Sequence, residues 1–278
     1  MTWWAIDVRT SPEGRQRLSE WLVVRTGQAV EERDDGTLVT FAADERAADA
    51  LIAEIGSRAD ATAETARRPL DDVDWSVRWS DGLGPRHFGR LTVVPSWISE
   101  ARNPTETTVV LDPETAFGSG EHGSTRAALR LLERLIHPGD MVLDLGSGSG
   151  ILAIAAIKLG ARLAIGIEND AEANQVARRN AVRNSVEAKV ELLEGDAGDL
   201  APLAGPADLV LSNILRMVNA ALLPAIVGAL RPGGIAIFSG MEESEAALFR
   251  PLLAGVGLEA LDEVVDTGWW AVAAARGP

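Results

Sequence analysis

The 278 residues, 46% of them hydrophobic and 24% charged, fit a soluble protein of two modest domains, or of one large domain with an extension, without a membrane-spanning run or a secretion signal. The formal net charge of −15 disfavours a nucleic-acid backbone as partner and favours cationic partners, although acidity also serves solubility alone. The lack of cysteine and the wide spacing of three histidines exclude a disulfide framework and argue against a metal centre, which suits a cytoplasmic protein.

Residues 1–67 predict a small α+β domain in the order strand, helix, strand, strand, helix, strand. A capping serine before proline, Ser11-Pro12, starts the first helix, and Asp34-Asp35-Gly36 joins two strands as a hairpin. Asp44 caps the second helix. This order is the ferredoxin-like arrangement. Because such a unit by itself supplies no catalysis, we expect its role to be binding.

Residues 68–106 predict a linker rich in proline, glycine and tryptophan. Its tryptophans, Trp75, Trp79 and Trp97, are large for a free linker. We expect them to pin this segment onto one of the two domains.

From residue 107 to 278, short apolar strands alternate with helices, which predicts a parallel sheet covered on both faces. Two final strands joined by Asp266-Thr267-Gly268 indicate a terminal hairpin. The predicted fold is therefore a doubly wound, Rossmann-like α/β domain with an antiparallel terminal hairpin. The expected strands are 141–145, 163–168, 190–193, 209–212, 235–239, 258–265 and 269–275, with helices at 151–158, 171–184, 217–230 and 244–254.

A glycine-rich turn, Asp144-Leu145-Gly146-Ser147-Gly148-Ser149-Gly150, leads from the first of these strands into a helix. Glycines let a backbone approach a ligand closely, and helix-starting amides then face it. The dinucleotide fingerprint places its third glycine where this chain has Ile151. The spacing instead resembles the first motif of methyltransferases that use S-adenosylmethionine (SAM), with a purely structural turn as the alternative. Asp144, Gly146 and Gly148 are the candidate cofactor-binding residues.

Two acids follow the next two strands. Glu168 lies 22 residues after Gly146, where a carboxylate meets ribose hydroxyls in doubly wound nucleotide sites. Asn169 follows it as a further candidate. Asp196 lies at the same sheet edge, where an adenine amino group could be met. An exposed strand-end acid and a surface turn are the respective alternatives.

Asn213 ends the following strand in Leu211-Ser212-Asn213-Ile214-Leu215. Its carboxamide can accept a hydrogen bond from a reacting amine and donate one to the cofactor. Methyltransferases of base amines usually have Asn-Pro-Pro-aromatic here, and the aromatic ring stacks on the flipped base. Ile214 and Leu215 occupy those positions in a chain without tyrosine. The pattern predicts an amine target, disfavours a nucleobase, and makes Asn213 the candidate catalytic residue.

The glycine-rich segment 112–125 predicts a mobile lid before a helix. Such a lid could exclude water and place Phe117 and Gly118 against a cofactor. Thr125 could bond the amino-acid end of the cofactor or only cap the helix. His122 could act as a base or be incidental.

These motifs, in this order, resemble the bacterial methyltransferases that modify the large-subunit ribosomal protein L-eleven. The family reads Asp-Pro-Gly-x-Ala-Phe-Gly-Thr-Gly-x-His-x-Thr-Thr over the lid, and this chain departs from it at Glu114, Ser119 and Ser124. The glycine-rich turn, the acid at Glu168 and the tripeptide beginning at Asn213 also match. The amino-terminal segment agrees in architecture more than in residues.

The resemblance implies a cytoplasmic enzyme that methylates lysine side chains or an α-amine of a basic ribosomal protein. It implies SAM as cofactor, contacted by Thr125, Gly146, Glu168 and Asn213, and substrate recognition by the first domain. Catalysis would depend on proximity and alignment, without a metal or covalent intermediate. The alternatives are a methyltransferase of another protein or a small-molecule amine, one of nucleic acid, and a SAM-binding module without catalysis.

Overall fold

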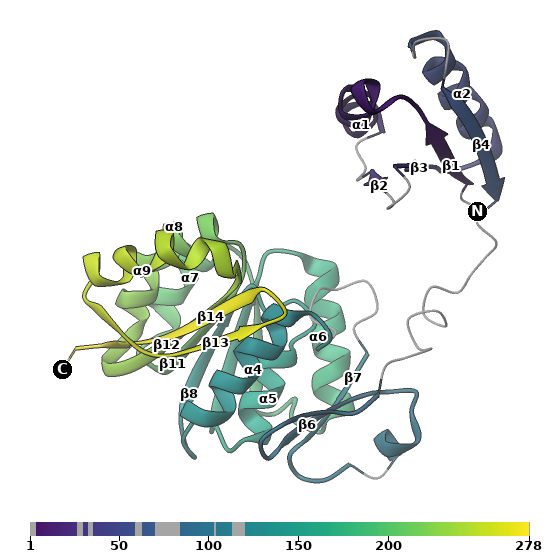
Figure 1. Cartoon of the computed structure of the whole chain (residues 1–278). Helices are drawn as coiled ribbons and strands as arrows, with labels where there is room; N and C mark the ends of the chain where they lie inside the picture. Colours follow the sequence, from purple (N-terminus) through teal and green to yellow (C-terminus); the bar gives the residue numbers. More distant parts are fainter. Residues whose placement is uncertain are drawn as a thin grey trace. The chain divides into compact units, whose positions relative to one another are not determined.

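The computed structural model of the protein describes residues 4–26, 30–32, 36–58, 63–69, 84–102, 104–112 and 120–277 (Figure 1). The chain divides into two compact units, Met1–Asp81 and Gly82–Pro278. Among the described residues, no helix has the length and apolar character that a membrane crossing requires.

The first unit contains a four-stranded antiparallel sheet in the order β2-β3-β1-β4. Apolar side chains of both helices and the sheet, including Leu22, Leu38 and Ile55, form its core. The side chain of Asp44 accepts a hydrogen bond of 2.7 Å from the Ala47 amide, which confirms the predicted cap. The predicted order of elements is also confirmed: β1 (Trp4–Arg9), α1 (Pro12–Thr26), β2 (Glu31–Glu32), β3 (Leu38–Ala42), α2 (Glu45–Arg58) and β4 (Glu64–Pro69).

The second unit is built on a seven-stranded sheet in the order β10-β9-β8-β11-β12-β14-β13. The first five strands in this order run parallel, and β14 pairs antiparallel with both β12 and β13. This arrangement confirms the predicted doubly wound sheet with a terminal hairpin. The strands are β8 (Met141–Leu145), β9 (Leu163–Glu168), β10 (Val190–Glu194), β11 (Ala207–Asn213), β12 (Leu230–Glu242), β13 (Leu258–Asp266) and β14 (Trp269–Arg276).

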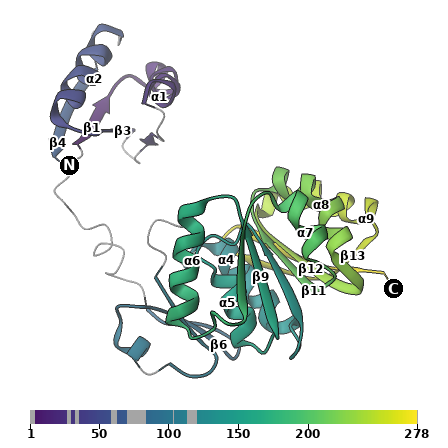
Figure 2. The ribbon, with the colours of Figure 1, turned by 180° about the vertical axis from the view of Figure 1, so that it is seen from behind.

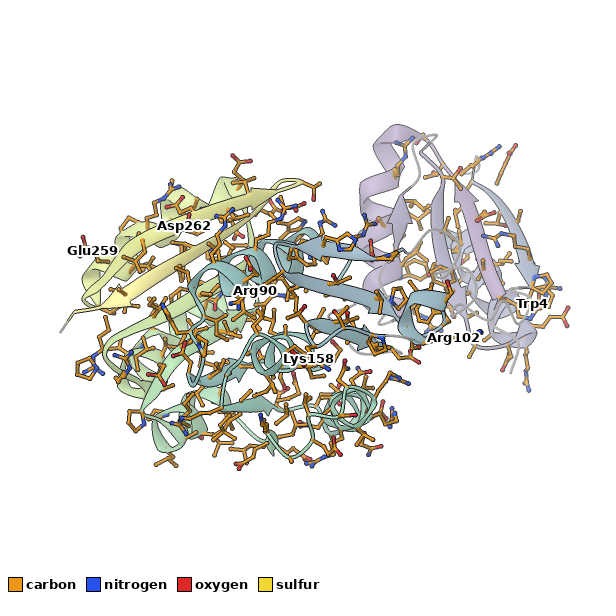
Figure 3. All side chains as sticks on the ribbon, turned by 90° about the horizontal axis from the view of Figure 1, so that it is seen from below. Trp4, Arg90, Arg102, Lys158, Glu259 and Asp262 are labelled. Atoms are coloured by element: carbon orange, nitrogen blue, oxygen red, sulfur yellow. The ribbon has the colours of Figure 1, made fainter. Side chains whose placement is uncertain are left out.

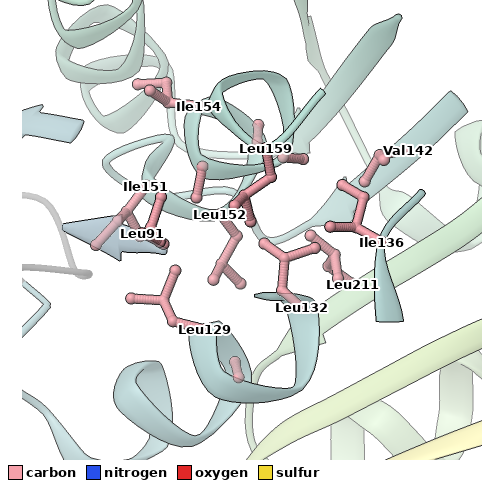
Figure 4. Packing of buried hydrophobic residues seen from close by; sticks show 14 of the residues in the cluster. Leu91, Leu129, Leu132, Ile136, Val142, Ile151, Leu152, Ile154, Leu159 and Leu211 are labelled. Carbon is pink, nitrogen blue, oxygen red and sulfur yellow. The ribbon is translucent and has the colours of Figure 1, made fainter. Parts of the chain in front are cut away.

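Helices cover both faces of this sheet (Figure 2). Successive side chains of a strand point to opposite faces, so Val142 joins one core cluster while Leu143 and Leu145 join the other. Leu132 and Leu152 pack with Val142 in the first cluster (Figure 4). Charged side chains such as Arg90 and Glu259 lie at the surface (Figure 3). The helices are α4 (Gly123–Leu135), α5 (Ile151–Lys158), α6 (Ala171–Arg183), α7 (Ala197–Ala204), α8 (Arg216–Ala229) and α9 (Ala246–Gly255).

A small sheet of β5 (Arg86–Phe88), β6 (Leu91–Pro95) and β7 (Thr108–Leu111) belongs to the second unit, and a 3-10 helix, η1 (Ser99–Arg102), follows β6. The structure thus places β5, β6 and η1 within the range 68–106 that the sequence marks as a linker. Trp97 is 40% exposed, so it does not pin the segment as expected. Trp75 and Trp79 lie outside the described residues.

The strand before the expected lid is anchored by two buried asparagines of the α6 region. Asn184 accepts from the Val110 amide at 2.8 Å and donates to the Val110 carbonyl at 2.7 Å. Asn180 makes the same pair of bonds with the backbone of Asp112, at 3.1 and 3.0 Å. These bonds fix the point from which the chain leaves toward α4.

Candidate active site

A cavity of about 530 Å³ opens where the parallel strands of the second unit end. In doubly wound folds, ligands bind in the crevice outside these carboxyl ends, and the volume lies in the range of small-molecule sites. Its wall comes from the strand ends, the turns after them, α8, and the first residue of β14. The lining residues are His122, Ser124, Gly146, Gly148, Ile167, Glu168, Asn169, Gly195, Asp196, Ala197, Asn213, Ile214, Leu215, Val218, Leu222, Gly240 and Trp269.

The structure brings most of the predicted site residues to this cavity. Thr125 and Asp144 are buried behind its wall rather than lining it. Phe117 and Gly118 lie outside the described residues. The predicted residues that line the cavity are Gly146, Gly148, Glu168, Asn169, Asp196 and Asn213.

The glycine-rich turn requires glycine at particular positions. Gly146 and Gly148 have φ values of +68° and +52°, a region that side chains with a β-carbon disfavour. A β-carbon on Gly146 would also lie 2.7 Å from Cγ2 of Ile214. The turn therefore leaves its backbone open to the cavity while Ile214 packs against it.

Asp144 supports this turn from behind. Its Oδ2 accepts a hydrogen bond of 3.0 Å from the Ala153 amide and so ties β8 to α5. Burial raises the pKa of Asp144 to about 7 despite that bond, and the charge of Glu168 adds to the rise. Its position favours support of the loop, while its predicted contact with the cofactor stays a prediction.

Glu168 accepts hydrogen bonds from backbone amides and also lines the cavity. One carboxylate oxygen accepts from the Gly148 amide at 3.0 Å, and the other accepts from the amides of Asn169 and Asp170 at 3.0 and 3.1 Å. A carboxylate offers about four acceptor positions, so one remains for a ligand hydroxyl. Asn174 holds the Glu168 carbonyl at 3.0 Å, which fixes the strand end.

Two acids, Asp170 after β9 and Asp196 after β10, cap the helices that follow them. Asp170 accepts from the amides of Glu172 and Ala173 at 2.8 and 3.4 Å and so caps α6. Asp196 accepts from the Gly198 amide at 2.7 Å and caps α7, a helix that the sequence did not predict. Asp196 therefore both caps a helix and lines the cavity. Its contact with adenine stays a prediction.

Asn213 presents an unsatisfied acceptor at the other end of the cavity. Its Nδ2 donates to Thr125 Oγ1 at 3.2 Å. Within the described part of the chain, its buried Oδ1 has no hydrogen-bond partner. Buried acceptors of this kind are costly unless a ligand or water donates to them. Together with the open glycine turn and Glu168, this atom fits a ligand that carries ribose hydroxyls and amino groups.

Behind Asn213 lies a buried polar network that sequence reasoning missed. Asn219 of α8, fully buried, accepts from Ser212 Oγ at 2.6 Å and donates to the carbonyls of Ile214 and Ser239 at 2.8 and 2.9 Å. Ser239 Oγ in turn donates to the Ser124 carbonyl at 2.8 Å. The network joins β11, β12, α8 and the start of α4.

The terminal hairpin supplies the remaining wall, which the sequence also did not indicate. The ring centroids of Trp269 and His122 lie 4.2 Å apart at an interplanar angle of 59°. Asp266 bonds to Arg126 and lies 3.0 Å from Arg130, so the hairpin is attached to α4. Arg126, above all by its hydrogen bond, holds the pKa of Asp266 below its ordinary value.

A doubly wound sheet with this glycine turn, a strand-end acid and a strand-end amide defines a SAM-dependent methyltransferase domain of Rossmann type. The family described as ribosomal protein L11 methyltransferase (PrmA) matches residues 2–277, and the chain belongs to this family.

Individual proteins agree with this assignment. A ribosomal protein L11 methyltransferase of Pelotomaculum thermopropionicum is 41% identical over 210 residues, which cover 75% of this chain and 67% of the relative. The Thermus thermophilus protein of the same name is 39% identical over 74% of this chain and 79% of its own length. The crystal structure of a ribosomal protein L11 methylase from Lactobacillus delbrueckii subsp. bulgaricus matches with a TM-score of 0.63 and 29% identity, over 70% of this chain and 100% of that chain.

Proposed function

We propose that the protein transfers methyl groups from SAM to lysine side-chain or α-amino groups of ribosomal protein L11. The observation that carries the proposal is the buried, unsatisfied Oδ1 of Asn213 at one end of the cavity. Membership of the family and the names of the relatives support ribosomal protein L11 as the substrate. The net charge of −15 suits a basic protein partner.

Different residues along the cavity would bind different parts of SAM. The backbone of Gly146 and Gly148 would face the cofactor, Glu168 would accept from its ribose, and Asp196 would meet its adenine amino group. Asn213 and Thr125 would lie at its amino-acid end. When bound, SAM supplies a methyl group on a positively charged sulfur, which a nitrogen lone pair displaces in line.

The substrate amine must be neutral to attack, whereas a free lysine with a pKa of about 10.4 is mostly protonated at pH 7. The cavity lining includes the apolar side chains of Ile214, Leu215 and Trp269, and such a surface disfavours the charged form of an enclosed amine. Asn213 Oδ1 would accept one amine hydrogen and hold the nitrogen for attack. None of the described lining residues is Lys or Arg, so none of them competes with the amine for that acceptor.

The direct test is transfer of labelled methyl from SAM to ribosomal protein L11 purified from cells that lack the enzyme. Mass spectrometry of the product would give the modified amines and the number of methyl groups on each. Free lysine and total RNA serve as competing acceptors. Label in either of these, with none in ribosomal protein L11, would overturn the proposal.

Two variants separate the parts of the proposal. Asn213→Ala should lower kcat at least about tenfold and SAM affinity far less, because its proposed bond to the reacting amine acts mainly in the transition state. A chain of residues 82–278 should bind SAM but leave ribosomal protein L11 unmodified, because the first unit is proposed to recognise the substrate. Full activity of that shortened chain would refute only the proposed role of the first unit in substrate recognition.

A further inference from the structure

His122 lines the part of the cavity where Asn213 is proposed to bind the substrate amine. The His122 ring contacts other residues on two sides. Its Nδ1 lies 2.7 Å from Ser124 Oγ, and its ring packs against Trp269. Ser124 is itself fully buried and tied to β12 through Ser239. A loop histidine without fixed contacts would be incidental, whereas this ring has a defined position in the wall.

The first turn of α4 connects His122 with Asn213. Ser124 contacts the His122 ring, and the next residue, Thr125, accepts the hydrogen bond from Asn213 Nδ2. Both His122 and Asn213 also line the cavity. The imidazole and the unsatisfied carboxamide oxygen therefore belong to the same end of the cavity.

Methylation of a protonated amine requires an acceptor for the proton that its nitrogen loses. The attacking nitrogen must lose a proton before the first transfer, and the methylammonium product must lose another before a second transfer. Three titratable side chains occur among the described lining residues: His122, Glu168 and Asp196. Glu168 and Asp196 are engaged with backbone amides at the strand ends beyond the glycine turn. Among the residues that the structure describes, His122 is the titratable group of the cavity wall that is linked to Asn213 through the first turn of α4.

We propose that His122 is a catalytic residue that accepts the proton of the substrate ammonium group, an inference that rests on the proposed amine methylation. The ammonium N–H bond breaks and its proton bonds to an imidazole nitrogen. The freed lone pair then forms the N–CH3 bond as the CH3–S bond breaks, and the thioether leaves with the electron pair. The imidazolium passes its proton to water, and the same exchange prepares the amine for each further methyl group.

The surroundings of the ring keep it in the accepting form. Burial lowers the pKa of His122 below its ordinary value, and the nearby Arg126 adds to the fall. Asp266, which would act in the opposite direction, is paired with two arginines. The charged side chains on the elements around the ring are Arg126, Arg130, Asp266, Glu121 and Arg86. The lowered pKa therefore favours the uncharged imidazole, the form that can take a proton.

The test compares His122→Phe, which retains a ring against Trp269, and His122→Gln with the wild type. Activity on ribosomal protein L11 is measured from pH 6.5 to 9.5, together with SAM affinity and the distribution of methyl groups. At pH 7 both variants should lose about 100-fold in kcat, in the range of general-base catalysis. The loss should shrink as the pH rises, because hydroxide then deprotonates the amine without the enzyme, and products should shift toward the monomethyl form. His137→Gln, a change of an exposed histidine outside the cavity, should leave all of these unchanged.

A loss in kcat that is the same at every pH would overturn the proposal and leave His122 as a packing partner of Trp269. Unchanged kcat in either folded variant would overturn it as well. So would loss of SAM binding in both folded variants, since it would place His122 in the cofactor site. A wild-type protein that binds SAM but methylates no amine contradicts the proposed function itself, a result independent of the variants.

Discussion

The carboxamide of Asn219 donates a hydrogen bond of 2.8 Å to the carbonyl oxygen of Ile214, the residue that follows Asn213. The same side chain reaches Ser212 and Ser239, so one buried group joins the end of β11, the middle of β12 and the first turn of α8. Asn213 thus owes its position to a residue six places further along the chain.

Replacement of Asn219 by alanine should impair catalysis through Asn213. The change leaves buried partners unsatisfied, at a cost of roughly 1–3 kcal/mol for each such group. We expect a lower free energy of unfolding and at least about a tenfold lower kcat, since misplacement of a reacting group carries penalties of this size. Asn184→Ala is the matched control, because Asn184 is also buried and makes three hydrogen bonds to the backbone away from the cavity. Equal kcat losses in the two variants would show that Asn219 acts only through stability.

Gly240 of β12 packs closely against Ile214, in the same segment as Asn213. Its φ is +82°, and an added β-carbon would lie 2.4 Å from the Ile214 carbonyl oxygen. Gly257 has a φ of +76° with nothing within 4 Å of such a carbon. Both glycine-to-alanine changes should cost about 1–2 kcal/mol in backbone strain. Gly240→Ala should in addition displace Ile214 and weaken SAM binding in calorimetry, whereas Gly257→Ala should bind normally. Normal binding by both variants would refute the close packing at Ile214.

Glu168→Gln should lower SAM affinity by about tenfold or more, because a hydrogen bond to a charged acceptor contributes roughly 1.5–3 kcal/mol. Calorimetric titration measures the change. Glu172→Gln, a change of an exposed acid in the first turn of α6, should leave affinity unaltered. Equal affinities of the Glu168 variant and the wild type would rule out the proposed bond to ribose.

Asp144 should make stability depend on pH. Its pKa of about 7 in the folded protein exceeds the ordinary value of about 3.9 in an unfolded chain. The folded state therefore binds more protons between these values, and the stabilisation is lost as the pH rises toward and through 7. Asp144→Asn cannot lose a proton. Its free energy of unfolding in urea should rise relative to the wild type between pH 5 and 8. Asp199→Asn, a change of an exposed acid, should follow the wild-type slope, and a parallel slope for the Asp144 variant would contradict the raised pKa.

The sequence predicted those parts of the site that depend on local patterns. A strand end followed by a glycine turn, as at Gly146, or by an acid or amide, as at Glu168 and Asn213, is recognisable without tertiary contacts. The parallel sheet then brings these strand ends to one edge. Whether a side chain faces the cavity or lies behind it is decided by packing. A local pattern therefore does not separate Thr125 and Asp144, which lie behind the wall, from the residues that line it.

The missed residues depend on contacts between distant segments. Trp269 reaches the cavity because the terminal hairpin attaches to α4, and no local pattern records that attachment. Gly240 lies within β12 and has no turn signature, and its importance comes from its close approach to Ile214. Helix α7 was missed because it is short and contains Pro202, a residue that argues against a helix.

The attachment of the hairpin to α4 also bears on how the protein folds. The bond between Arg126 and Asp266 joins residues 140 positions apart, and that between Thr125 and Asn213 spans 88. Such contacts pay a large loop-closure entropy and form slowly compared with helices. The cavity is therefore complete only once nearly the whole second unit has folded. During refolding, recovery of SAM binding should lag behind recovery of helix content, so ligand binding reports the final step rather than the early collapse.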